Sequence, residues 1–235
     1  MNTKFLSTLT ATVTATAAAT ALFGAAAPAQ AASFGTGGMT FEQDTTVKFN
    51  FLGSHGMFKS SLGIYEVDNN STPSIVKTLF SEIKRSDNNR QNEWQGTLGN
   101  TVLDGEQVFT FLANKIYTLG LDSGDDGTVY STSTLNTRST QQAVFGPPSV
   151  WDGVSLSDTR RFPDAGQFTD GLSAVFNGGA LISLDDRGNG DDADFQDFTV
   201  TAAAVPEPMT MTGLALGLGG LVAARRRRGG SKTAS

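Results

Sequence analysis

The sequence has no cysteine and a single histidine among its 235 residues, and both scarcities exclude classes of protein. Without cysteine there are no disulfides, no thiolate metal sites and no cysteine nucleophile. With His55 alone, sites built from several histidines are excluded, and the Gly-x-Ser-x-Gly motif of many serine hydrolases is absent. We therefore expect no enzyme, and a secreted hydrolase is kept as a minor alternative.

Basic residues are scarce in the middle of the chain. Residues 32–204 hold 22 acidic against 11 basic side chains, a net charge of about −11, whereas residues 205–235 hold five cations. Such an acidic segment is repelled by nucleic acid and by anionic membrane surfaces. We expect no nucleic-acid partner, and the segment is long enough for one domain with a sizeable core.

Residues 1–31 have the pattern of a secretory signal peptide. Lys4 is their one charge, and an uncharged run follows it as far as Ala27. Ala29 and Ala31 then form the small-x-small pattern that signal peptidase cleaves. The first 31 residues thus predict a signal helix and export.

The C-terminal segment combines three features in order. Val205, Pro206, Glu207 and Pro208 are followed by sixteen uncharged residues, 209–224. The prolines keep the motif extended, and the apolar run is a slightly short candidate for one transmembrane helix. The arginines that close the segment would stay on the cytoplasmic side of the inner membrane; they are Arg225, Arg226, Arg227 and Arg228.

Over residues 205–228 this tail resembles the PEP-CTERM sorting signal of bacteria with an outer membrane. The Pro-Glu-Pro triplet, the apolar helix and the Arg cluster all match, and residues 229–235 extend beyond it as a short cytoplasmic end. The resemblance implies cleavage near the triplet by an exosortase. It also implies transient anchoring in the inner membrane, followed by a place in the cell envelope or extracellular matrix.

The middle segment, 32–204, reads as an all-β domain. Val47, Phe49 and Phe51 alternate with polar residues, which is the period of a half-buried strand. Further β-rich runs are separated by Gly- and Asp-rich turns, so we expect a single β-sandwich or jelly-roll-like domain.

Three local predictions accompany this fold. The runs 108–112 and 116–121 are expected to form a hairpin through Ala113-Asn114-Lys115. The runs 180–184 and 195–202 are expected to pair across a Gly/Asp loop. The spacing of the apolar residues in 75–83, after Thr72 and Pro73, fits a short helix as well as a strand.

The loop of the second hairpin carries the densest charge in the chain. Carboxylates this close repel one another by about 1 kcal/mol per pair in water at 4 Å, and by more when partly buried. Calcium would offset this repulsion, because it binds six to eight oxygens in irregular geometry. A solvated acidic turn and a catalytic carboxylate pair are the alternatives. The candidate ligands are Asp185, Asp186, Asn189, Asp191, Asp192, Asp194 and Asp197.

The same hairpin resembles the closing hairpin of a secreted bacterial domain of unknown function that often precedes such sorting signals. The matching residues include Asp185-Asp186, Gly190-Asp191 and Phe195-Gln196-Asp197. The resemblance implies a β-rich fold and a calcium site, and it brings no established reaction. Gln196 replaces the usual Asn, which leaves a ligand role for residue 196 open.

Three smaller features have a structural and a functional interpretation. Trp94 and Trp151 are candidate glycan contacts, since a flat aromatic ring suits a sugar face, or they pack in the core. Asp122, Asp125 and Asp126 form a tight turn or a second cation site.

The sequence thus predicts a non-enzymatic exported protein, processed by signal peptidase and an exosortase and stabilised by calcium. A lectin-like, polysaccharide-binding module is the alternative.

Overall fold

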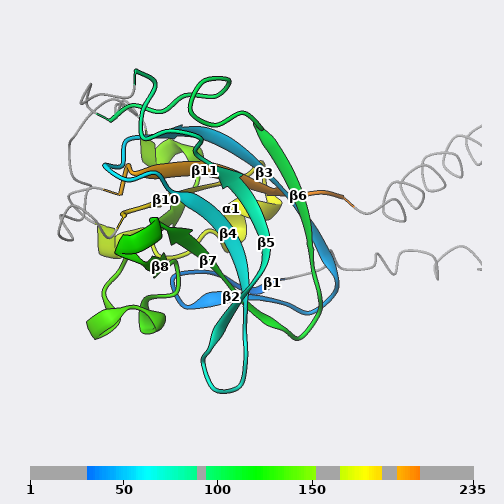
Figure 1. Ribbon diagram of the computed structural model, residues 1–235. Helices are drawn as coiled ribbons and strands as arrows, with labels where there is room; N and C mark the ends of the chain where they lie inside the picture. The colour runs from blue at the N-terminus through cyan, green and yellow to red at the C-terminus, as the bar shows by residue number, and fades with distance from the viewer. Residues whose placement is uncertain (1–30, 89–93, 152–164, 187–194, 207–235) are drawn as a thin grey trace, which may run out of the picture.

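The computed structural model describes residues 31–88, 94–151, 165–186 and 195–206. Their regular structure is mostly strand, in two antiparallel sheets (Figure 1). The predicted signal helix before residue 31 and the predicted membrane helix at 209–224 lie outside these ranges. Among the helices that are described, none is long and apolar enough to cross a membrane.

The first sheet has the order β1-β2-β7-β4-β5, and β8 pairs with β7 beside this path. Its strands are β1 (Ala31–Gly35), β2 (Gly38–Phe41), β7 (Ile116–Asp122), β4 (Ser61–Val67), β5 (Pro73–Ser81) and β8 (Thr128–Tyr130).

The second sheet has the order β6-β3-β11-β10-β9. Its strands are β6 (Glu106–Phe111), β3 (Thr45–Ser54), β11 (Phe198–Ala204), β10 (Ala180–Leu184) and β9 (Ala143–Gly146). The short helix α1 (Leu172–Phe176) packs against β1, β10 and β11.

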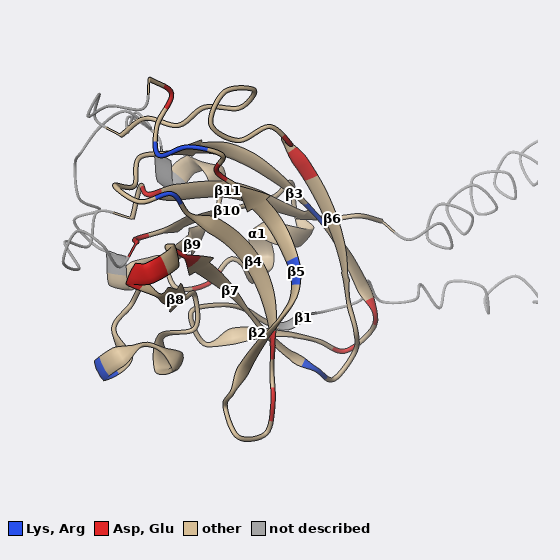
Figure 2. Cartoon of the chain, in the orientation of Figure 1, with Lys and Arg blue, Asp and Glu red and all other residues tan. Residues whose placement is uncertain are grey.

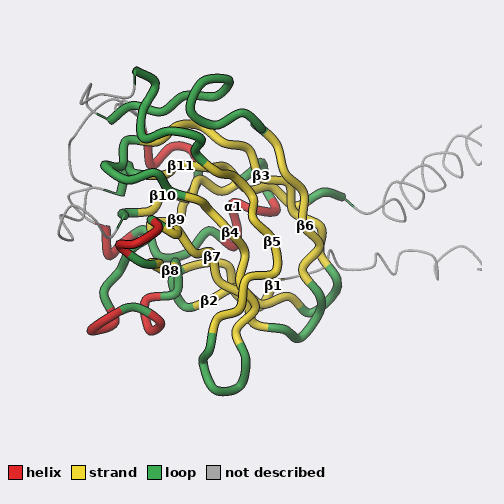
Figure 3. The backbone as a smooth tube through the Cα atoms, viewed as in Figure 1, coloured by secondary structure: helices red, strands yellow, loops and turns green. Residues whose placement is uncertain are grey.

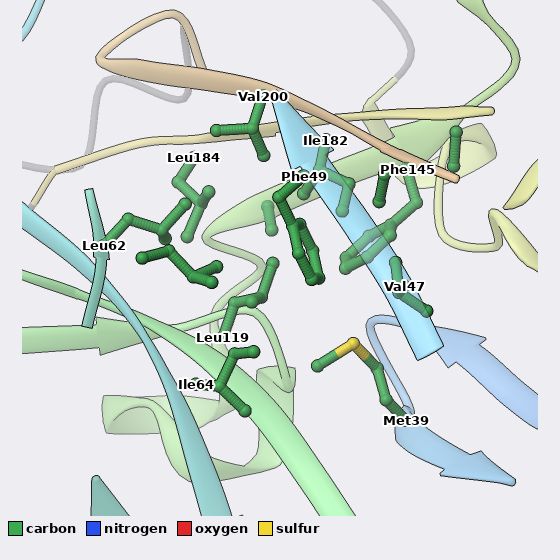
Figure 4. Packing of buried hydrophobic residues seen from close by; sticks show 14 of the residues in the cluster. Met39, Val47, Phe49, Leu62, Ile64, Leu119, Phe145, Ile182, Leu184 and Val200 are labelled. Atoms are coloured by element: carbon green, nitrogen blue, oxygen red, sulfur yellow. The ribbon is translucent and has the colours of Figure 1, made fainter. Parts of the chain in front are cut away.

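Aromatic side chains join the two sheets. Phe41 of β2 stacks on Phe111 of β6 at 4.8 Å between ring centroids, and Phe51 of β3 lies 6.0 Å from Phe80 of β5. Figure 4 shows aliphatic side chains of β4 and β7 pointing toward those of β10 and β11. This arrangement is consistent with the predicted all-β sandwich.

The predicted alternation of buried and exposed side chains is present in β3. Val47, Phe49 and Phe51 are buried, while Thr46, Lys48 and Asn50 between them are partly exposed. The predicted pairing of 180–184 with the segment after 195 is also confirmed, because β10 and β11 are antiparallel neighbours with Leu184 opposite Phe198.

The helix considered for residues 75–83 is wrong, because Pro73–Ser81 is the edge strand β5. Its pairing with β4 has two irregularities, between Leu62 and Gly63 and between Ile64 and Tyr65. Irregular pairing breaks the two-residue period of a strand, so the consecutive side chains Leu79 and Phe80 are both buried. The disturbed period imitates helical spacing.

The hairpin predicted through residues 113–115 is also wrong, although both strands exist. β6 pairs with β3 in one sheet, and β7 pairs with β2 and β4 in the other, so the connection crosses between sheets. Asn114 takes a left-handed backbone at φ 61°, and its N–H donates to the carbonyl oxygen of Phe41 at 2.9 Å. A local turn signal does not reveal in which sheet the next strand pairs.

Candidate functional site

Three predicted calcium ligands are described, and all three are buried at the base of the β10–β11 hairpin. Asp185 and Asp186 follow β10 and have no exposed surface, and Asp197 precedes β11 with 3% of its surface exposed. The four remaining candidates, Asn189, Asp191, Asp192 and Asp194, lie outside the described residues. Isolated carboxylates are rarely buried to this degree, since burial disfavours their charged form.

Asp197 holds the base of the hairpin together. Its Oδ2 accepts the backbone N–H of Asp186 at 2.5 Å. Its carbonyl oxygen accepts the N–H groups of His55 at 3.2 Å and Gly56 at 3.3 Å. On the other side, the N–H of Asp185 donates to the carbonyl oxygen of Gln142 at 3.1 Å. The hairpin base is therefore tied to the segment that follows β3 and to the one that precedes β9.

Gly56 lets this backbone approach the carboxylates closely. A Cβ at position 56 would lie 2.6 Å from Oδ2 of Asp186 and 3.2 Å from Cβ of Asp197. These distances are shorter than ordinary carbon contacts, so a larger residue does not fit without a shift. His55, the one histidine, is 6% exposed beside this contact. Its backbone N–H is part of the hairpin base, because it donates to the carbonyl oxygen of Asp197.

Sequence reasoning missed a fourth buried carboxyl group, Glu82. It follows β5 and is 3% exposed. Oε1 accepts the Ser54 hydroxyl at 2.5 Å, and Oε2 accepts the N–H of Ser60 at 2.8 Å. Because Ser54 ends β3 and Ser60 precedes β4, Glu82 links the two sheets. In the sequence, Glu82 stands out only as an acidic residue within the apolar pattern of residues 75–83. Such a residue equally fits the polar face of a helix over these residues.

Burial raises the pKa of Glu82 to about 7. The hydrogen bonds from Ser54 and Ser60 act in the opposite direction, Asp186 raises the pKa further, and Lys59 lowers it. Asp186 is thus close enough for its charge to act on Glu82. Glu82 therefore interacts electrostatically with Asp186 of the hairpin base.

Phe195 adds strain at the same place. It is 1% exposed and adopts a left-handed backbone at φ 54°, which is unusual for a bulky residue. Strain of this kind persists where the surroundings fix the conformation, and it concentrates at functional sites.

The donor chemistry of the hairpin base fits a hard cation. Carboxylate oxygens on a loop base are the ligands that calcium prefers. Within the described ranges, however, no three His, Asp or Glu side chains are already placed to hold a metal ion. A complete ligand set would therefore have to draw on candidates between residues 187 and 194.

The second acidic cluster forms a turn. Gly124–Asp126 is a short 3₁₀ turn, η1, between β7 and β8, and it is drawn in red in Figure 2. The N–H of Gly124 donates to Oδ1 of Asp122 at 3.0 Å, and Asp125 and Asp126 are exposed. This geometry confirms the interpretation as a tight turn.

The two tryptophans lie in different settings. Trp94 is half-buried and has a left-handed backbone at φ 55°. It belongs to the long connection between β5 and β6, whose described parts are green in Figure 3. Trp151 ends the 3₁₀ turn Pro148–Trp151. The two predicted glycan contacts thus lie in two different segments of the described chain.

The two ends of the domain lie on the same side of the molecule, opposite the acidic hairpin. Ala31, the first residue of β1, pairs with Phe41, and the N–H of Val205 donates to the carbonyl oxygen of Thr46 at 2.8 Å. At the other end of β3, Ser54 pairs with Phe198 beside the hairpin base. The strand from Thr46 to Ser54 spans roughly 26 Å at the usual rise. Figure 1 shows the start of β1 and the end of β11 on the same side of the molecule.

Of the predicted sorting residues, Val205 and Pro206 are described, and both are exposed directly after β11. Glu207, Pro208 and Arg225 to Arg228 lie outside the described residues, as does Ala29 of the predicted signal-peptidase site.

Comparison with protein-family models, with curated proteins and with solved structures found no match. The site therefore has to be interpreted from its own geometry and from the sequence.

Proposed function

We propose that this chain is a non-enzymatic exported protein of the cell envelope or extracellular matrix. Signal peptidase removes its first 31 residues, and an exosortase in the inner membrane cleaves it near Pro206-Glu207-Pro208. Calcium stabilises the acidic hairpin of the exported domain, which is a sandwich of the jelly-roll-like kind. The repeated passage of the chain between the two sheets supports this last assignment.

The observation that carries the proposal is the position of the tail motif. The last strand ends at Ala204, and Val205 and Pro206 follow it in exposed positions. A protease needs an extended and accessible segment, and prolines keep such a segment out of a helix. Cleavage at this point would leave every described strand intact.

The relative placement of the two regions supports the proposal as well. The tail junction and the acidic hairpin lie at opposite ends of β3. While the tail is anchored in a membrane, the hairpin end would therefore be directed away from it. A cation site there would face the solution on the exported side of the inner membrane.

The experiment is to express the full-length chain in a host with an exosortase and in the same host without it. We expect the mass of the exported protein to show loss of the tail near residues 206–208 in the first host alone. A variant with Arg225 to Arg228 replaced by serine should be processed poorly, because the positive charges hold the tail in the membrane. Identical masses in both hosts would contradict the proposal.

A further inference from the structure

Trp94 has an unusual backbone for its size. Its φ of 55° lies in the left-handed region, which disfavours residues with a Cβ. Ordinary surface loops relieve such strain by using glycine or asparagine. At Trp94 the strain is retained in a residue whose side chain is half-buried.

Hydrogen bonds on the C-terminal side hold Trp94 in place. Gly96 and Ser54 exchange two backbone hydrogen bonds, of 2.9 and 3.0 Å, which fix the loop to the end of β3. The carbonyl oxygen of Gln95 accepts the N–H of Asp87 at 2.8 Å. These hydrogen bonds fix the backbone directly after Trp94.

The side chain of Asp87 adds further hydrogen bonds within this loop. Its carboxylate accepts the N–H of Thr97 at 3.0 Å, the Thr97 hydroxyl at 2.7 Å and the Thr101 hydroxyl at 2.7 Å. Hydrogen bonds to a charged acceptor are stronger than neutral ones. The loop on which Trp94 sits is therefore preorganised, which is what a binding platform requires.

The same loop carries several polar side chains. The Lys84 ammonium donates to the Asp87 carbonyl oxygen at 2.7 Å and to Oδ1 of Asn100 at 2.5 Å. Asn100 and Gln95 are exposed. Amide groups both donate and accept hydrogen bonds, so they match the hydroxyl groups of a sugar.

We propose that Trp94, with the exposed Gln95 next to it in the chain and the exposed Asn100 in the same loop, is the stacking platform of a carbohydrate-binding site for a pyranose chain. The apolar face of a pyranose ring packs on an aromatic ring while the ring's hydroxyls bind polar groups beside it. The site lies at the end of β3 opposite the tail junction, so a membrane-anchored molecule would present it outward. The inference names a ligand for the proposed exported protein and rests on that proposal for the ligand's access.

The test uses the exported, processed protein and soluble oligosaccharides of glucose, N-acetylglucosamine and mannuronate, with affinity measured by calorimetry. At least one is expected to bind. The Trp94→Gly variant should lose about tenfold or more in affinity while its melting temperature stays equal or rises, since glycine accepts the left-handed backbone without strain. Trp94→Phe, which keeps a ring, should lose less.

Two outcomes would overturn the inference: no binding of any of the three oligosaccharides, or unchanged binding in Trp94→Gly. A fall in melting temperature in Trp94→Gly with unchanged affinity would assign the ring to core packing. Tail processing is measured on the same variants. Normal processing without sugar binding would refute this site and leave the proposed export intact.

Discussion

At the scale of single residues, Glu82 is the most informative side chain of the domain. It is a buried carboxyl group whose two oxygens connect Ser54 and Ser60, and hence the two sheets. Its raised pKa, about 7, means that the folded protein holds the proton more tightly than the unfolded chain does. The group therefore stabilises the fold most fully below its unfolded pKa, and this stability is lost as the pH rises through about 7.

The Glu82→Gln variant tests this linkage. The shift from 4.5 to about 7 corresponds to a contribution on the order of 3 kcal/mol that is lost in alkaline solution. Gln has no such titration, and its amide can serve both serines once the Ser54 hydroxyl turns to accept. We expect the variant to lose less stability than the wild type between about pH 5 and about pH 8.5 in urea titrations. Equal pH dependence in both proteins would contradict the assignment.

Gly56 gives a second prediction at this scale. The Gly56→Ala variant should lose about 1–3 kcal/mol of unfolding free energy, because its Cβ would press on Asp186 and Asp197. Gly37→Ala is the matched control, since a Cβ at position 37 meets no atom within 4 Å. Denaturant titration of both variants measures the difference. A Gly56→Ala protein as stable as the control would show that the hairpin base is loosely packed.

At the scale of elements, the sequence predicted what is encoded locally. The alternation of Val47, Phe49 and Phe51 identified β3, and the apolar runs on either side of the acidic loop identified β10 and β11. Pairing information is not local, so the apolar spacing of β5 also fits a helix, and the crossing from β6 to β7 has the local pattern of a hairpin. Glu82 was missed for the same reason, because its partners are 22 and 28 residues away in the chain.

The two acidic hairpins provide an element-scale prediction. In the β10–β11 hairpin Asp197 is buried, whereas in the β7–β8 hairpin Asp125 is exposed. If calcium binds the first hairpin, Asp197→Asn should reduce the calcium-dependent rise in melting temperature, and Asp125→Asn should not. Both substitutions remove one negative charge, so non-specific screening would affect them equally. An equal effect of the two substitutions would therefore argue for screening rather than for a site.

At the scale of the whole molecule, the chain junctions lie at one end of the domain and the candidate functional sites at the other. Its first strand begins beside Phe41, and the residue after its last strand binds Thr46. The hairpin base and the Trp94 loop are attached to the opposite end of β3. Chain junctions at one end leave the other end free to face the surroundings. This geometry relates the proposed sorting tail, the proposed cation site and the proposed sugar platform in one orientation.

The central claim about the folded domain is that calcium stabilises the acidic hairpin. The most direct test is a thermal melt of the exported, processed protein in millimolar calcium, in magnesium and in EDTA. Binding linkage predicts stabilisation of about 2.7 kcal/mol when calcium exceeds its Kd a hundredfold. We therefore predict a melting temperature several degrees higher in calcium than in EDTA, with little effect of magnesium. Identical melts in the three solutions would contradict the claim and identify the loop as a solvated acidic turn.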